Sequence, residues 1–173
     1  TLYPRLKQRI CSSCSAYHAA RWYDFHGDYE QAREQAAMAL TFLERDGVGP
    51  GETVFVAWLA DYLGQPERSA EAIQELETDA SKESDIFRRN RFALYFLAEA
   101  LTGVDPEAAQ DIYLEHGSSV IPIHDLVGRI HLWYPLMDSP EVRERLSQYP
   151  DWIQLCRDLW PEGRPFPLDD SDG

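Results

Sequence analysis

Apolar and small residues recur every three or four positions along most of this chain. From Tyr29 to Leu43 they occupy positions 29, 32, 36, 39 and 43, and from Ala70 to Ala80 positions 70, 73, 76 and 80. These spacings place the side chains on one face of an α-helix. Strand-like runs are scarce: VFVAWLADYL has the length of a helix, and SVIPI is ambiguous. The pattern therefore predicts an all-α protein.

Short turns separate the predicted segments. We expect helices at residues 5–26, 28–46, 52–64, 66–80, 84–102, 105–116, 122–134, 139–148 and 150–160. The remaining residues 161–173, PEGRPFPLDDSDG, are rich in proline and acidic residues, and they predict a flexible acidic tail.

A glycine, a short turn and an alanine-rich helix start occur three times. The glycines are Gly27, Gly64 and Gly103. The small residues that follow, Ala32, Ala70 and Ala108, are 38 residues apart, which indicates an internal repeat. Glycine accommodates the left-handed conformation that closes a helix, and an aspartate after it, Asp28 or Asp105, suits the cap of the next helix. We expect Ala32 and Ala108 at the close crossings of paired helices.

The segment GDYEQAREQAAMAL, from Gly27 to Leu40, resembles the second half of a tetratricopeptide (TPR) unit. The matching residues are Gly27, Tyr29, Ala32 and Ala39, with Ala20 and Tyr23 in the preceding helix. Two later copies match less well, at Gly64 and Ala72 and at Gly103 and Ala108. The second has an extra residue before Ala70, the third has Phe96 in place of a small residue, and the spacing exceeds the family's roughly 34 residues.

This resemblance covers Cys11 to about His116 and implies an α-solenoid, a right-handed superhelix of stacked antiparallel helix pairs. We expect one TPR-like domain over residues 1–160. Its repeats span about 11–46, 52–80 and 84–116, and closing helices occupy 122–160.

The resemblance also implies a function in protein recognition, because the first helices of TPR-like pairs line an inner wall that commonly receives a peptide. The predicted partner-binding residues on this wall are Tyr17, Arg21, Asp24, Phe25, Trp58, Asp61 and Tyr62. Aromatic rings supply contact area and carboxylates select basic residues. Aromatic stripes are also typical of a core, and a register error of one residue rotates the set by about 100°.

The charge of the chain limits the class of partner. Sixteen basic and 30 acidic residues give a formal charge of −14, which repels phosphate backbones and anionic membranes and favours basic partners. We therefore expect no nucleic-acid binding and no membrane association. The start, TLYPRLKQRI, lacks a secretory apolar core, and three cysteines fit reduced thiols, so we expect a cytoplasmic protein. Because the sequence starts at Thr1, we expect a fragment or processed form.

A metal site is the first chemical alternative. In CSSCSAYH, the side chains of Cys11, Cys14 and His18 share a helical face, as three zinc ligands would. A structural site needs a fourth ligand, and His26 lies about 12 Å further along a straight helix. We expect no metal and no cofactor. Cys156 has the spacing of a core residue.

An enzyme is the second alternative. Ser118, His124 and Asp125 are close in sequence, but neither a nucleophile elbow nor a known nucleotide or metal motif accompanies them. A deep cleft holding His124 within hydrogen-bond reach of a carboxylate would favour this alternative. We expect a non-enzymatic scaffold or adaptor for a protein or peptide, as the partner-docking part of a larger regulator. The alternative binding function is that of a small acidic immunity protein or chaperone that neutralises a basic target.

Overall fold

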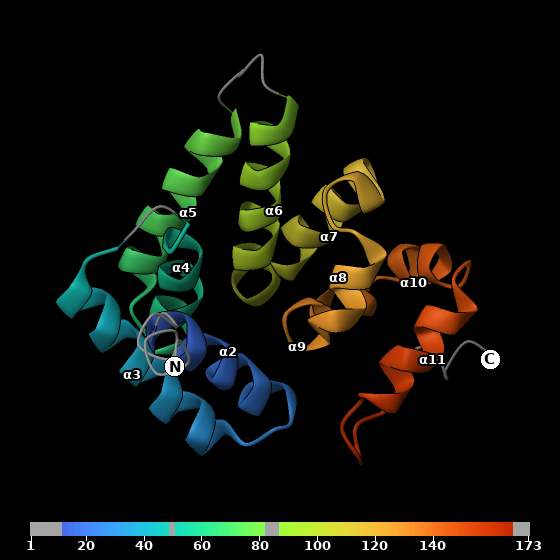
Figure 1. Cartoon of the computed structure of the whole chain (residues 1–173), viewed down its shortest axis with the longest axis horizontal. Helices are drawn as coiled ribbons and strands as arrows, with labels where there is room; N and C mark the ends of the chain where they lie inside the picture. Colours follow the sequence, from blue (N-terminus) through green and yellow to red (C-terminus); the bar gives the residue numbers. More distant parts are fainter. Residues whose placement is uncertain (1–11, 49–50, 82–86, 168–173) are drawn as a thin grey trace, which may run out of the picture. The chain divides into compact units, whose positions relative to one another are not determined.

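A computed structural model describes residues 12–48, 51–81 and 87–167, the side chains of residues 87–90 excepted. Over these ranges the protein is all-α and contains no strand, as the sequence predicted (Figure 1). None of the described helices combines the length and the apolar character that a membrane span requires.

The chain forms two compact units, Thr1–Ile73 and Gln74–Gly173, here named the N-terminal and C-terminal units. Their boundary falls inside helix α5 (Pro66–Ser81). The single domain expected over residues 1–160 stays a prediction.

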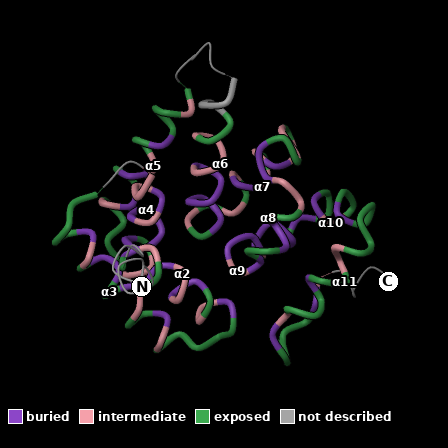
Figure 2. The backbone as a smooth tube through the Cα atoms, viewed as in Figure 1, coloured by how far each residue is buried: buried purple, intermediate pink, exposed green. Residues whose placement is uncertain are grey.

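In the N-terminal unit, consecutive helices pack against one another. These helices are α2 (Ser12–Phe25), α3 (Tyr29–Asp46) and α4 (Thr53–Tyr62), followed by the start of α5. Helices α2 and α3 lie side by side as a pair, and α4 contacts both (Figure 1). Buried and exposed positions alternate along α3 with the helical period (Figure 2). Ala20, Ala32, Ala36 and Ala39 are fully buried, and such small side chains let helices approach closely.

Two turns of this unit have the same geometry. Gly27 and Gly64 adopt positive φ angles of 79° and 76°, which side chains with a Cβ rarely adopt. Each glycine N–H donates to the carbonyl three residues earlier, of Asp24 or Asp61, at 3.0 and 2.9 Å. The N–H of the next residue reaches five residues back in both turns, at 2.9 and 2.8 Å. The predicted left-handed glycine caps are thus confirmed at these two positions.

The turn predicted at Gly103 is wrong. Gly103 lies inside helix α6 (Phe87–Val104), and the chain leaves the helix at Asp105, with φ −143° and ψ 82°. The residue before a proline avoids the helical region, so Pro106 forces α6 to end at Val104. The Asp105 carboxylate accepts the N–H of Ala108 and caps the next helix, so this turn needs no left-handed glycine.

The buried small residues follow the capping positions rather than a fixed spacing. Ala32, Ser69 and Ala109 each lie four residues after the turn residues Asp28, Gln65 and Asp105. Each donates its N–H to the carbonyl of that turn residue, at 2.9, 3.1 and 3.2 Å respectively, and all three are at most 2% exposed.

Ala32 is therefore buried as predicted, whereas Ala70 is exposed and Ala108 is only partly buried. The expectation for Ala108 is wrong by one residue, because the equal spacing of 38 did not allow for turns of different length.

The C-terminal unit is built from shorter elements after α6. They are α7 (Pro106–His116), η1 (Gly117–Ser119), α8 (Ile123–Gly128), α9 (Ile130–Trp133), η2 (Tyr134–Asp138), α10 (Pro140–Leu146) and α11 (Pro150–Asp158). Helix α6 packs on α7, α8 contacts α9 and α11, and α10 contacts α7.

The single helix predicted at 122–134 is broken at Arg129, which adopts φ −126° and ψ 40°. Gly128, a weak helix former, ends α8, and the side chain of Arg129 contacts Asp125 and the buried Glu99. These contacts place the break beside the pocket described below.

The first part of the predicted flexible tail is packed against the C-terminal unit. Phe166 is 5% exposed, and its ring lies 5.1 Å from that of Trp160 and 5.1 Å from the guanidinium of Arg157. The Trp160 indole N–H donates to the carbonyl of Pro165 at 3.1 Å. Aromatic burial and a hydrogen bond thus hold residues 161–167, while residues 168–173 lie outside the described ranges.

Candidate functional site

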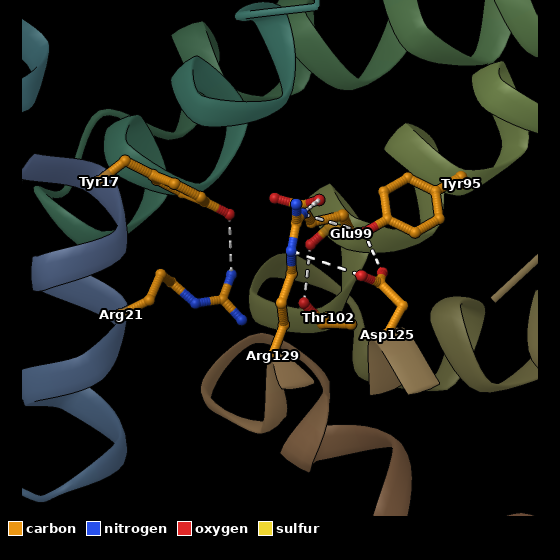
Figure 3. Close-up of polar contacts among 7 residues, drawn as sticks. All are labelled: Tyr17, Arg21, Tyr95, Glu99, Thr102, Asp125 and Arg129. Carbon is orange, nitrogen blue, oxygen red and sulfur yellow. Dashed lines mark hydrogen bonds and ion pairs between the residues drawn. The ribbon is translucent and has the colours of Figure 1, made fainter. Parts of the chain in front are cut away.

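Most of the partner-binding residues predicted from the sequence come together in the N-terminal unit. The ring of Trp58 stacks on that of Tyr62, with centroids 4.6 Å apart and planes at 22°. The guanidinium of Arg21 lies 4.9 Å from the Trp58 ring, and Tyr17 meets the same ring edge-on at 5.8 Å. Arg21 also donates to the Tyr17 hydroxyl at 3.4 Å (Figure 3). The result is a continuous stack of aromatic and guanidinium groups from α2 and α4.

Most of this stack is interior. Tyr17, Arg21, Phe25 and Trp58 are at most 3% exposed. This agrees with the alternative interpretation of the aromatic stripe, in which the rings belong to the core. Asp24 and Tyr62 are partly exposed and Asp61 is exposed. Of the predicted residues, Asp24, Asp61 and Tyr62 are accessible to a partner in this structure. The buried residues Tyr17, Arg21, Phe25 and Trp58 belong to the core.

Tyr62 is the link between the buried stack and the surface. Burial raises the pKa of its hydroxyl to about 12, and the charge of the Asp24 carboxylate and its hydrogen bond with Tyr62 act in the same direction. The nearby Arg33 guanidinium opposes them. Tyr62 is thus a neutral phenol, fixed by Trp58 on one face and by Asp24 at its hydroxyl. We name Asp24, Asp61 and Tyr62 the Tyr62 surface.

A second candidate site lies in the C-terminal unit. A pocket of about 600 Å³ is lined by α6, by the end of η1 and the segment after it, and by α8 with the residue that follows it. The lining residues are Arg91, Phe92, Tyr95, Phe96, Ser119, Val120, Pro122, His124, Asp125 and Arg129. We name it the α6–α8 pocket.

A polar network forms one wall of this pocket (Figure 3). The Tyr95 hydroxyl donates to Asp125 Oδ2 at 2.5 Å, and Arg129 Nη1 donates to the Tyr95 hydroxyl at 3.2 Å. Arg129 Nε lies 3.5 Å from Asp125 Oδ1, and its Nη1 lies 4.0 Å from Glu99 Oε2. Glu99 is 3% exposed, so a buried carboxylate faces a guanidinium at the pocket wall.

This environment keeps Tyr95 protonated. Burial raises the pKa of the phenol far above its usual value, and the Glu99 charge and the hydrogen bond to Asp125 raise it further. Tyr95 therefore acts as a neutral hydrogen-bond donor to Asp125.

Ser118, His124 and Asp125, the residues considered for an enzyme, do not form a catalytic triad in the structure. Ser118 is exposed in η1, and the two oxygens of Asp125 contact Tyr95 and Arg129. His124 lines the same pocket, and no hydrogen bond joins it to a carboxylate in the part of the chain described.

Sequence reasoning named His124 and Asp125 but missed Tyr95, Glu99 and Arg129. The spacing of Phe92, Tyr95 and Phe96 on one helical face was a readable signal for an aromatic surface. The contacts of Tyr95 with α8 and the residue after it span 30 and 34 residues, and a single sequence does not reveal such pairings.

The proposed metal ligands fall partly outside the structure. Cys11 is not among the described residues, and Cys14 is half-buried. Within residues 12–48, 51–81 and 87–167, no three His, Cys, Asp or Glu side chains are grouped as metal ligands would be. Cys156 is buried as its spacing predicted, and burial raises the pKa of its thiol to about 11.

Comparisons with protein-family models, characterised proteins and solved structures found no match to this chain. The resemblance to TPR units therefore rests on the residues quoted from the sequence alone. The structure establishes the coarser description, an all-α chain whose helices pack largely in sequential pairs.

Proposed function

We propose that the protein is a non-enzymatic scaffold of TPR-like helix pairs, stacked as a right-handed solenoid, that binds a partner protein or peptide as the docking part of a regulator. The observation that carries this proposal is the Tyr62 surface. The main-chain carbonyls of Asp24 and Asp61 accept the glycine N–H in two successive turns, which gives the two residues equivalent places at the ends of α2 and α4. Tyr62 continues the buried stack to the surface, where its hydroxyl contacts Asp24.

The Tyr62 surface favours a partner segment that carries lysine or arginine. Tyr62 is held by Trp58 and Asp24, so little side-chain freedom remains to be lost when a partner covers it. The carboxylates of Asp24, at the Tyr62 hydroxyl, and of exposed Asp61, next to Tyr62 in the sequence, would attract a cation, and the net charge of −14 would speed the encounter with a basic molecule.

A displayed library of random peptides, selected on the full chain, tests this proposal. We expect the selected peptides to be enriched in lysine and arginine. Asp24→Lys with Asp61→Lys should weaken their binding about tenfold or more, which is about 1.4 kcal/mol. Tyr62→Ala should weaken it by about 2 kcal/mol if the ring is a hot spot.

The control is Glu34→Lys with Glu71→Lys, which changes the total charge equally at two exposed sites of α3 and α5. The scaffold proposal requires this variant to bind nearly as well as the unaltered chain. If both charge-reversed variants lose binding equally, total charge decides affinity. That result favours the alternative of an acidic protein that neutralises a basic target.

Trp58→Ala is unsuited to this experiment. Trp58 is 3% exposed, so its truncation is expected to remove core packing and cost about 3–5 kcal/mol of folding free energy. A loss of binding in that variant would report unfolding rather than contact with the partner.

A further inference from the structure

The α6–α8 pocket has the size and the walls of a small-molecule site. Its volume of about 600 Å³ lies within the range of known ligand pockets. Phe92, Tyr95 and Phe96 of α6 form one wall of the pocket. Val120 and Pro122, in the segment after η1, also line the pocket. Phe92 is 64% exposed and lines this pocket, so its ring is accessible to a ligand.

The charged residues that line the pocket reverse the balance of the chain. Acidic residues outnumber basic ones by 30 to 16 overall, whereas the described residues that line the pocket include Arg91, Arg129 and His124 but one carboxylate, Asp125. The carboxylate of Glu99 lies behind Arg129 and is buried. Asp125 contacts the Tyr95 hydroxyl with one oxygen and the guanidinium with the other. An incoming cation would compete with both contacts and would meet two guanidinium groups.

Arg129 is held at the wall without being covered. Its side chain is 44% exposed, although it contacts Tyr95, Asp125 and the buried Glu99. These three groups orient the guanidinium, as supporting contacts orient the binding groups of other sites. A planar guanidinium with several N–H donors matches the two oxygens of a carboxylate.

We propose that the α6–α8 pocket binds a small organic carboxylate. Its apolar body lies against Phe92, Phe96 and Val120, and its carboxylate pairs with Arg129 and Arg91. This site lies entirely in the C-terminal unit and uses none of the residues of the Tyr62 surface, so it does not depend on the scaffold function proposed above.

Three probes with one body and different heads test the proposal on the full chain: 4-phenylbutyrate, 4-phenylbutanamide and 4-phenylbutylamine. Isothermal titration calorimetry at neutral pH and low salt measures their affinities. We expect the carboxylate to bind about tenfold more tightly than the amide or the amine, because only the carboxylate pairs with the arginines. Equal affinity of acid and amide, or no binding of the acid at millimolar concentration, would overturn the proposal.

Variants locate the binding. Phe92→Ala and Arg91→Gln change exposed side chains and should each lower the affinity for 4-phenylbutyrate several-fold or more. Arg129→Gln should lower it further, and because it also removes contacts of Glu99 and Asp125, circular dichroism must accompany it.

Arg45→Gln, an exposed site of the N-terminal unit, is the matched control and should leave the affinity unchanged. Binding that survives in both Phe92→Ala and Arg91→Gln would overturn the assignment to this pocket. The Asp24→Lys, Asp61→Lys variant should still bind the probe, so failure of either proposal is recognisable by itself.

Discussion

At the scale of single residues, Tyr62 is the group whose environment can be measured most directly. Burial, followed by the charge of Asp24 and its hydrogen bond with the phenol, raises the pKa of the hydroxyl from 10.0 to about 12. The folded protein therefore keeps a proton that the unfolded chain releases between these two pH values. The contribution of Tyr62 to stability is fully present below pH 10 and is lost as the pH rises towards 12.

We predict that the free energy of unfolding falls less steeply between about pH 10 and about pH 12 in Tyr62→Phe than in the unaltered chain, because the variant lacks this ionisation. Urea unfolding at several pH values, followed by circular dichroism, measures the slope. Tyr95 and Tyr113 also have raised pKa values, so the difference between the two proteins isolates Tyr62. If the free energy of unfolding had the same pH dependence in both proteins, the pKa of the Tyr62 hydroxyl would not be raised by folding.

Arg21 shows what residue-level reasoning on the sequence does not provide. Arginine is rarely buried. The TPR resemblance placed Arg21 on an inner binding wall. In the structure it is 1% exposed and lies over Trp58, 37 positions later in the chain. The grouping of Tyr17, Arg21 and Trp58 was predictable from periodicity, but their burial depends on how α4 covers α2.

At the scale of helices, the turn residue decides which small side chain enters the interface. Ala109 is fully buried four residues after Asp105, and its neighbour Ala108 is partly exposed. We predict that Ala109→Leu overpacks the contact of α7 with α6 and lowers the free energy of unfolding by about 1–3 kcal/mol. Ala108→Leu should lower the free energy of unfolding by less than half as much as Ala109→Leu.

Chemical denaturation of the two variants decides between the registers. The pair is matched in residue type, helix and volume change, so propensity cannot explain a difference. A larger effect at Ala108 would restore the register of equal 38-residue spacing. In the first pair, Ala32→Leu should resemble Ala109→Leu, and Ala37→Leu, at an exposed site, should be close to neutral.

The ends of most helices were predictable because their signals are local. Six predicted helices begin and end within two residues of α3, α4, α5, α7, α10 and α11. Capping residues and prolines lie within one turn of the ends that they determine. The break between α8 and α9 was not predicted, because it involves contacts of Arg129 with Glu99 in another helix.

At the scale of the whole molecule, the excess of acidic residues is expected to oppose folding. The chain carries a net charge of −14, and folding brings many of its carboxylates closer together than they are in the unfolded chain. The exposed ion pairs Arg45–Asp46 and Arg68–Glu44 compensate little, because solvent screens such pairs. Repulsion between like charges should therefore decide the response to salt.

We predict that raising sodium chloride from about 10 mM to about 150 mM increases the unfolding temperature, because the screening length falls from about 30 Å to about 8 Å. Differential scanning fluorimetry measures the change. Glu34→Lys with Glu71→Lys makes the net charge less negative by four and should show a smaller increase. A decrease with salt in the unaltered chain would mean that attractive pairs outweigh repulsion.

The capping register has a consequence for the search for distant relatives. The interior place four residues after the turn is filled by alanine, serine and alanine, and the Ser69 hydroxyl is satisfied by the carbonyl of Ala57 at 2.8 Å. The side chain at this position must therefore be small, but it can be apolar or polar. The number of residues between one such position and the next varies. An alignment that assumes one repeat length pairs Ala32 with exposed Ala70, whereas an alignment anchored on the turn pairs it with Ser69. Profiles for this architecture should therefore score residue size at an anchored position and allow gaps of variable length between anchors.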